Sequence, residues 1–339
     1  MLPSLGRQFI IGCTLLAVLA MGVLWWVDRY LQAPLAVVEA HQFSVAPGSN
    51  LTRVVNGLVE SEILDHPEVL LGYARISGQS EIKAGDYRLN SEDTPLSLLG
   101  KLSRGEVIEY QVTFPEGLTA KEWLLRLTNS EQVELGISIA AVPTLPFVDG
   151  SPEGWLYPDT YQYHSGATDV EILRRAYQVM RQVLDEEWQN RSADLPYKTP
   201  YEALIMASII EKETGVPEER QQIAGVFVRR LQKGMRLQTD PTVIYGLGDR
   251  YSGNLTRRHL REHTAFNTYV IKGLPPTPIA NPGRAAIHAA LHPAEGDALY
   301  FVAKGDGSHV FSATLAEHER AVDKYQRRKN NNYRSSPSS

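Results

Sequence analysis

The chain has 339 residues, of which 43% are hydrophobic and 22% are charged, a composition that excludes an intrinsically disordered protein and allows a sizeable core. The formal net charge is −5 and the pI is near 6.0, so nucleic acid is not expected as a partner. The single cysteine, Cys13, lies in the apolar N-terminal segment, so we expect no disulfide and no thiol chemistry in the rest of the chain.

Near the N-terminus, residues 9–27 form a run of nineteen residues without a charge. This length is close to the roughly 20 residues with which a helix spans a bilayer. Trp25 and Trp26 lie where an interfacial aromatic belt is expected, and Arg7 before the run favours a cytoplasmic N-terminus. We therefore expect an uncleaved anchor. A signal peptide processed at Ala20 is the alternative, although the apolar run continues beyond that residue.

The next hundred residues alternate between strand and helix patterns. The expected elements are a strand at 41–45, helices at 51–61 and 67–76, a turn and strand at 82–89, a helix from Thr94 to Gly105 and a strand at 106–114. The opening, residues 43–51, resembles the start of a LysM module, a small fold that binds N-acetylated glycan chains. A structural βα unit without a glycan-binding role is the alternative.

A core helix is predicted around residues 203–210, which are almost wholly apolar. Thr199 is the expected N-cap and Glu202 the capping-box acid, while Gly215 is the expected stop. Glu211 follows the apolar residues on the same helix. The sequence therefore places a carboxyl group at the end of a buried helix.

Two acids, Glu211 and Glu213, end this helix and point about 200° apart. Desolvation and the negative end of the helix dipole both disfavour the ionised form of Glu211. Its pKa is expected to rise towards the range of a general acid. Glu213 is expected to brace the structure rather than to catalyse. A solvated acid in a frayed last turn is the alternative interpretation of Glu211.

Further sequence blocks follow the acidic helix in order. The blocks that carry a family resemblance are residues 211–214 (Glu-Lys-Glu-Thr), 226–231, 235–246, 264–269, 273–283 and 299–303. Together they resemble the endolytic murein transglycosylases, membrane-anchored enzymes that cut nascent peptidoglycan strands. The resemblance covers essentially the whole chain and implies that Glu211 is the catalytic acid. Arg229 and Phe266 depart from the usual asparagine and tyrosine of the family, which puts any role of these two positions in doubt.

The chemistry implied by the resemblance requires a single carboxyl group. Glu211 would protonate the glycosidic oxygen that leaves MurNAc and would then remove the proton of the sugar's own 6-hydroxyl, giving a 1,6-anhydro end. Gln238, Asp240, Asn267 and Tyr269 are the predicted substrate-binding residues because they can hydrogen-bond sugar hydroxyl and acetamido groups. Asp240 is also the candidate to stabilise an oxocarbenium-like charge. Turn-forming or capping roles are the alternatives for Asp240 and Asn267.

A metal enzyme is the first rival class, because His288 and His292 have helical i, i+4 spacing. The His-Glu-x-x-His pattern does not accompany them, and Pro293 is expected to end the helix. We therefore expect surface or capping roles for the two histidines, with no metal and no cofactor. No phosphate-binding glycine loop and no Gly-x-Ser-x-Gly motif is present, which excludes nucleotide and serine-hydrolase chemistry.

The whole sequence predicts an α+β protein. The expected parts are a cytoplasmic N-terminus (1–8), a transmembrane anchor (9–27), a linker (28–40), a LysM-like subdomain (41–110), a mixed α+β catalytic domain (111–325) and a disordered tail (326–339). The resemblance implies peptidoglycan glycan strands as substrate, penicillin-binding proteins or other glycan polymerases as partners, and an inner-membrane protein with a periplasmic body. A non-catalytic glycan-binding scaffold and a hydrolytic muramidase are the alternative functions.

Overall fold

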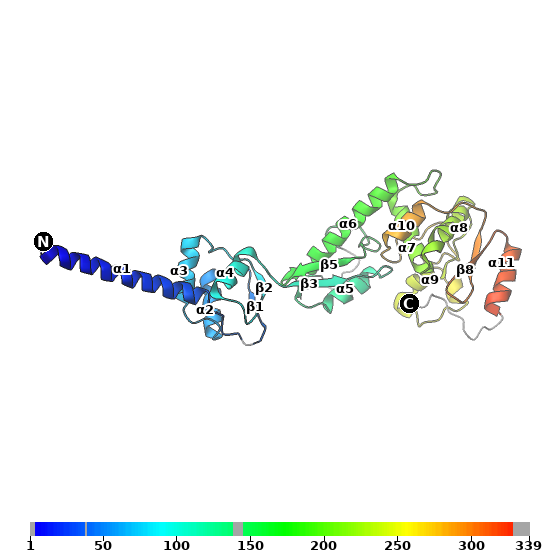
Figure 1. The fold of residues 1–339 in the computed structure, drawn as a ribbon. Coiled ribbons are helices and arrows are strands. Elements are labelled where there is room, and N and C mark those ends of the chain that lie inside the picture. Colours follow the sequence, from blue (N-terminus) through cyan, green and yellow to red (C-terminus); the bar gives the residue numbers. More distant parts are fainter. Residues whose placement is uncertain (1–3, 38, 138–144, 328–339) are drawn as a thin grey trace. The chain divides into compact units, whose positions relative to one another are not determined.

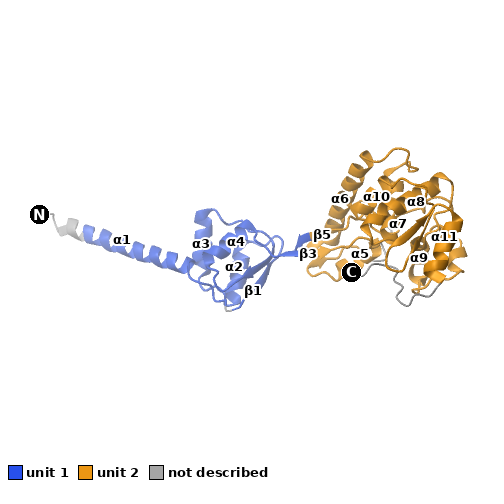
Figure 2. Ribbon diagram, turned by 45° about the vertical axis from the view of Figure 1, so that its right-hand side comes forward, with its two compact units in different colours: residues 1–110, 162–166 blue, residues 111–161, 167–339 orange. Residues whose placement is uncertain are grey.

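The computed structural model describes residues 4–37, 39–137 and 145–327 (Figure 1). Helices and short two-stranded sheets make up the chain, which confirms the predicted mixed α+β class. Two compact units are present, residues 1–110 with 162–166 and residues 111–161 with 167–339 (Figure 2). The tail that was expected to be disordered lies outside the described residues from position 328 onwards.

Helix α1 (Ser4–Leu31) contains the predicted apolar run. Its segment Phe9–Leu31 is long and apolar enough to cross a membrane, and the most apolar part of this segment is not buried in the molecule. The last turn of the helix belongs to the first unit, because Leu31 is buried in that unit's core and the Tyr30 hydroxyl accepts a hydrogen bond from the His66 amide at 3.1 Å. The helix thus fits a membrane anchor or a signal sequence.

The rest of the first unit has the order β-α-α-β-α. Its elements are β1 (His41–Val45), α2 (Leu51–Glu60), α3 (Pro67–Ser77), β2 (Gly85–Leu89) and α4 (Pro95–Arg104). Strands β1 and β2 pair antiparallel with Phe43 opposite Tyr87, whose side chain is fully buried in the core. The bounds of these elements agree with the sequence prediction to within a few residues. In α4, Thr94 is the N-cap and Gly105 the C-cap, as expected.

The second unit is mainly helical. Its longer elements are α5 (Ala120–Thr128), α6 (Asp169–Gln189), α7 (Pro200–Glu213), α8 (Arg220–Gln232), α9 (Asp240–Leu247), α10 (Arg284–Leu291) and α11 (Leu315–Val322). Its short strands are β4 (Val133–Glu134) with β6 (Ala167–Thr168), and β7 (Tyr300–Ala303) with β8 (His309–Ser312); β3 (Glu109–Thr113) and β5 (Thr160–His164), which pair with each other, span the division between the units. Single turns occur at Pro217–Glu219, Gly248–Arg250, His259–Arg261 and Asp323–Arg327.

Helix α7 is the central helix of this unit. It packs against α6, α8, α9 and α10 (Figure 1), and every side chain of residues 203–210 is buried, which confirms the predicted core helix. Because its sides are covered over this length, the acidic side chains of α7 lie only in its first and last turns. Glu211 and Glu213 therefore lie at the C-terminal end of a buried helix.

The ends of α7 differ in detail from the prediction. The Thr199 hydroxyl accepts a hydrogen bond from the Glu202 amide, as expected of an N-cap. The Glu202 carboxylate accepts its own hydrogen bond from the Lys198 amide rather than from Thr199, so the expected capping box is not formed. At the other end the helix stops because Thr214 adopts an extended backbone, one residue before the expected stop at Gly215.

A buried asparagine, Asn281, holds the turn between β3 and α5 close to the end of α7. Its side chain donates to the Leu118 carbonyl and accepts from the Leu156 amide, both at 2.9 Å. The backbone of Asn281 also pairs with this turn, donating to Leu118 and accepting from Gly117. Since all these groups are buried or partly buried, the contacts fix two segments that are far apart in the sequence.

Glu153 is a second buried carboxyl group of this unit, only 5% exposed. It accepts hydrogen bonds from the Ala120 amide at the start of α5 and from the Tyr245 hydroxyl of α9. Burial raises the pKa of Glu153 to about 7, because these hydrogen bonds offset only part of the cost of desolvating the charge. The Glu153 carboxyl group thus connects α5 and α9, while its burial disfavours the ionised form.

We expect Glu153→Gln to flatten the dependence of stability on pH. The folded-state pKa of about 7 lies above the ordinary value of 4.5, so the folded protein holds an extra proton between these values and loses stability as pH rises through this window. By pH 8 the loss amounts to about 3 kcal/mol, and glutamine cannot titrate. Unfolding midpoints of the detergent-solubilised chain between pH 5 and 8 test this. Glu295→Gln, at an exposed position, is the control, and equal slopes for Glu153→Gln and wild type would contradict the assignment.

Candidate active site

Glu211 lies in the last turn of α7 with its side chain only 7% exposed. Its Oε2 atom accepts a hydrogen bond from the Gly283 amide at 3.1 Å, and its Oε1 atom lies 4.0 Å from Nη2 of Arg220. The same Nη2 atom is 3.8 Å from Oε2 of Glu116. One guanidinium group is therefore shared between two carboxyl groups, one buried and one half-exposed.

The pKa of Glu211 is raised above its ordinary value, as the sequence predicted. Burial is the largest cause and the negative charge of Glu116 adds to it, whereas the Gly283 amide, Arg220 and Lys212 oppose the rise. The pKa of Glu211 is thus higher than that of a free glutamate even though two cations nearby favour the carboxylate. A raised pKa is the direction of shift that a general acid requires.

Gly283 brings Glu116 and Glu211 to the same stretch of backbone. It is the N-cap residue of α10, and its amide donates to Glu211. A Cβ atom at this position would lie 1.7 Å from Oε1 of Glu116. Lys212 fixes the other side, because its Nζ atom donates to the Gly117 carbonyl at 3.1 Å. The glycine therefore leaves the space in which the second carboxylate lies.

A cavity of about 640 Å³ adjoins this cluster through Arg220. Its lining residues are Glu187, Pro217, Glu218, Arg220, Gln221, Arg284, Ala285, His288 and Ala289. Two guanidinium groups, those of Arg220 and Arg284, therefore face a space large enough for part of an extended polar ligand. Arg220 thus both lines the cavity and forms the ion pair with Glu211.

Three of the four predicted binding residues lie together at the start of α9. The Tyr269 hydroxyl donates to Oδ1 of Asp240 at 2.7 Å, and the Gln238 amide donates to the Thr268 carbonyl at 3.2 Å. Gln238 and Asp240 are exposed. Gln238 also has a positive φ of 54°, a left-handed conformation that is costly for a residue with a side chain. The arrangement leaves polar groups open to a ligand.

Asn267, the fourth predicted binding residue, is fully buried. Its amide nitrogen donates to the carbonyls of His259 and Glu262 at 3.1 and 2.7 Å, and its Oδ1 atom accepts from the Tyr269 amide at 3.0 Å. The side chain therefore holds the loop that positions Tyr269. A direct contact of Asn267 with substrate stays a prediction.

Glu213, not Glu211, contacts the segment that carries these binding residues. Its carboxylate accepts a hydrogen bond from the Thr239 hydroxyl, consistent with the predicted bracing role. Burial, with Asp240 nearby, raises the pKa of Glu213 to about 7. In the described part of the chain, no hydrogen bond or ion pair joins Glu211 to Gln238, Asp240, Asn267 or Tyr269. Glu211 and Glu213, the two acids at the end of α7, thus contact two different groups of residues.

Glu116, Arg220 and Gly283 are neighbours of Glu211 that the sequence alone does not reveal. Glu116 sits in a Pro-Glu-Gly turn far upstream, and Gly283 follows a proline far downstream, so neither has a local signal of chemistry. Arg220 begins α8, where its cationic side chain looks like an ordinary surface residue. Only the packing of the two loops against α7 brings them together.

The comparisons with known proteins give the family. The chain matches the YceG-like family over residues 43–324, most of its length, and therefore belongs to that family. It is 30% identical over 308 residues to the endolytic murein transglycosylase of Bacillus subtilis, covering 85% of each chain. This confirms the resemblance seen in the sequence.

Other relatives agree with this placement. A protein of the same name from Streptococcus pneumoniae is 28% identical over 322 residues, which span 82% of this chain and 57% of the pneumococcal one. A crystal structure of a putative YceG-like protein from Listeria monocytogenes, 28% identical, superposes with a TM-score of 0.52 over 83% of this chain and 99% of its own.

We expect opposite effects on Glu211 from its two charged neighbours. Glu116→Gln removes a negative charge and should lower the pKa of Glu211, whereas Arg220→Gln removes a positive charge and should raise it. Carbon-13 NMR titration of labelled glutamate carboxyls measures both, with the signal assigned by its loss in Glu211→Gln. Shifts of the same sign in both variants would show that these side chains do not act through their charge.

Proposed function

We propose that the chain is a lytic transglycosylase, a carbon-oxygen lyase that cuts inside nascent peptidoglycan strands. It would cleave the bond between MurNAc and GlcNAc, leave 1,6-anhydroMurNAc ends and terminate glycan elongation. The observation that carries the proposal is the buried Glu211 carboxyl with its raised pKa, in a chain that resembles proteins named endolytic murein transglycosylases.

A single carboxyl group suffices for this reaction. Protonated Glu211 donates its proton to the glycosidic oxygen as the bond from that oxygen to C1 of MurNAc breaks. The resulting carboxylate then removes the proton of the 6-hydroxyl, whose oxygen attacks C1 of the same sugar. Since this nucleophile is tethered to the reacting ring, no water has to be activated and none is consumed.

The neighbours of Glu211 suit both steps. Glu116 and burial favour the acid that the first step needs, and Arg220 with the Gly283 amide stabilises the carboxylate that the first step leaves. Glu211 therefore regains a proton in the second step and returns to its starting form. We assign no direct contact with substrate to Arg220.

Gln238, Asp240 and Tyr269 are the proposed sugar-binding residues. The exposure of Gln238 and Asp240 supports this role, and Asp240 is also the proposed stabiliser of oxocarbenium-like charge. The buried amide of Asn267 supports an indirect role through the Tyr269 backbone. In the first unit, the β-α-α-β order with β1 and β2 antiparallel supports a LysM-like glycan-binding unit in residues 41–110.

The proposed setting is the inner membrane, with α1 as a single uncleaved span, the N-terminus cytoplasmic and the body periplasmic. The continuity of α1 to Leu31, which packs into the core of the first unit, supports an anchor over a removable signal. Penicillin-binding proteins or other glycan polymerases are the proposed partners, because this activity acts on strands as they are made.

Glu211→Gln should lower the rate of glycan cleavage by about 100- to 10,000-fold, the usual contribution of a general acid. Uncrosslinked polymeric glycan is incubated with the full-length chain in detergent, and products are measured by mass spectrometry. Glu295→Gln, an exposed glutamate, is the matched control and should cut normally.

The mass of the new ends separates the alternative functions. Anhydro ends support the transglycosylase, whereas ends that have gained one water identify a hydrolytic muramidase. Intact glycan after incubation with wild type would favour the non-catalytic scaffold. Undiminished cleavage by Glu211→Gln would remove the assigned acid.

A further inference from the structure

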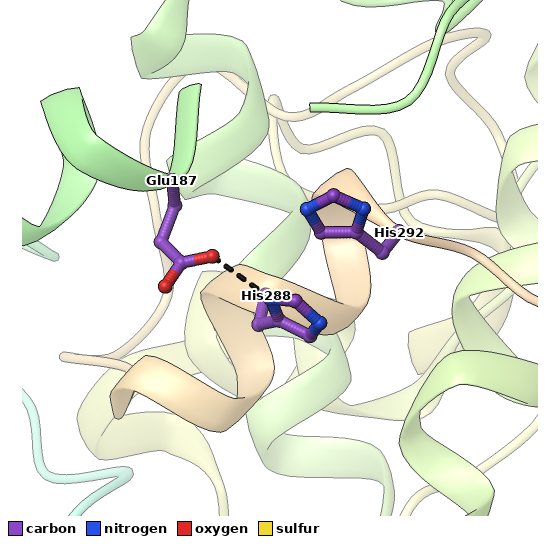
Figure 3. Close-up of side chains that lie close together, drawn as sticks. All are labelled: Glu187, His288 and His292. Carbon is purple, nitrogen blue, oxygen red and sulfur yellow. Dashed lines mark hydrogen bonds and ion pairs between the residues drawn. The ribbon is translucent and has the colours of Figure 1, made fainter. Parts of the chain in front are cut away.

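Three potential metal ligands meet where α6 packs against α10 (Figure 3). Glu187 comes from the last turns of α6, His288 from α10, and His292 is the C-cap of α10. One ligand atom of each lies within 4.8 Å of the other two. The two imidazole rings stack with centroids 4.2 Å apart, as i, i+4 spacing on one helix face allows.

Outer contacts already orient this cluster. Nδ1 of His292 lies 3.3 Å from the Ser192 hydroxyl, which leaves Nε2 of His292 available. Oε1 of Glu187 lies 3.1 Å from Nε of Arg284, which leaves Oε2, the atom that faces Nδ1 of His288 at 2.8 Å. Metal-binding histidines and carboxylates in proteins are usually held by such contacts through their second nitrogen or oxygen.

We propose that Glu187, His288 and His292 form a binding site for a zinc-type divalent transition metal. Two imidazole nitrogens and one carboxylate oxygen are a ligand set that suits Zn²⁺, with water in the fourth position. Ligand atoms around tetrahedral zinc lie about 3.4 Å apart, so side-chain rotations have to bring together atoms that now lie up to 4.8 Å apart and to separate Oε2 of Glu187 from Nδ1 of His288, now at 2.8 Å. Half of the His288 side chain is exposed, which gives the ion a path to the site.

The sequence alone predicts surface or capping roles for both histidines, and Pro293 does follow the end of α10. What the sequence lacked was the third ligand, since Glu187 belongs to another helix about a hundred positions away. Glu187 and His288 also line the cavity that Arg220 shares. A bound ion would add positive charge to the wall of that cavity. The metal site itself does not rest on the proposed function.

Zinc binding to the full-length chain tests the site. The protein is purified in detergent through a histidine-free tag, stripped with EDTA and titrated with ZnCl₂ in competition with a chromophoric chelator. One Zn²⁺ per chain is expected, with X-ray absorption showing imidazole nitrogens near 2.0 Å from the metal. Zn²⁺ should also raise the thermal unfolding midpoint of wild type.

The variants make the assignment specific. His288→Ala and His292→Ala should each weaken zinc binding at least about tenfold and abolish the thermal shift, and the near-isosteric Glu187→Gln should weaken binding without unfolding the chain. His263→Ala, which removes an exposed histidine outside the cluster, should bind as wild type does. Absence of stoichiometric binding by wild type, or unchanged affinity in both histidine variants of the cluster, would overturn the proposal.

Discussion

The burial of one carboxyl group at the end of an apolar helix is the constraint on which the rest of the second unit depends. Helix α7 is covered by four other helices over residues 203–210, and Glu211 follows directly after this buried stretch. There its carboxylate accepts a hydrogen bond from the Gly283 amide and lies 4.0 Å from the Arg220 guanidinium. Burial raises the pKa of Glu211, and these two groups oppose part of that rise.

The charges around Glu211 are balanced rather than simply attractive. A cation alone would hold the group ionised, and burial alone would hold it neutral. Nη2 of Arg220 lies 3.8 Å from the Glu116 carboxylate, and the two charges shift the pKa of Glu211 in opposite directions, so movements of either group would change that pKa. Asn281 limits such movements, because it ties the turn that follows Glu116 to the segment that precedes Gly283. The hydrogen bonds that hold these two loops therefore also help to set the pKa of Glu211.

Local sequence patterns predicted what local physics determines. The bounds of α7, the Thr199 cap and the β1–β2 elements follow from apolar periodicity and turn residues, which act over a few positions. Glu211 was predicted because its helix is apolar on every side. Glu116 and Gly283 could not be predicted, because their proximity to Glu211 is created by packing between distant loops. Glu202 shows a limit even at short range, since two neighbouring amides compete for one carboxylate.

The absence of a side chain at Gly283 affects which residues positions 116 and 283 can accept together. This missing side chain leaves the volume that the Glu116 carboxylate occupies, so a side chain at 283 would require the end of Glu116 to move, whereas every residue except proline would keep the amide that Glu211 uses. Among related chains, we therefore expect the residues at positions 116 and 283 to vary together.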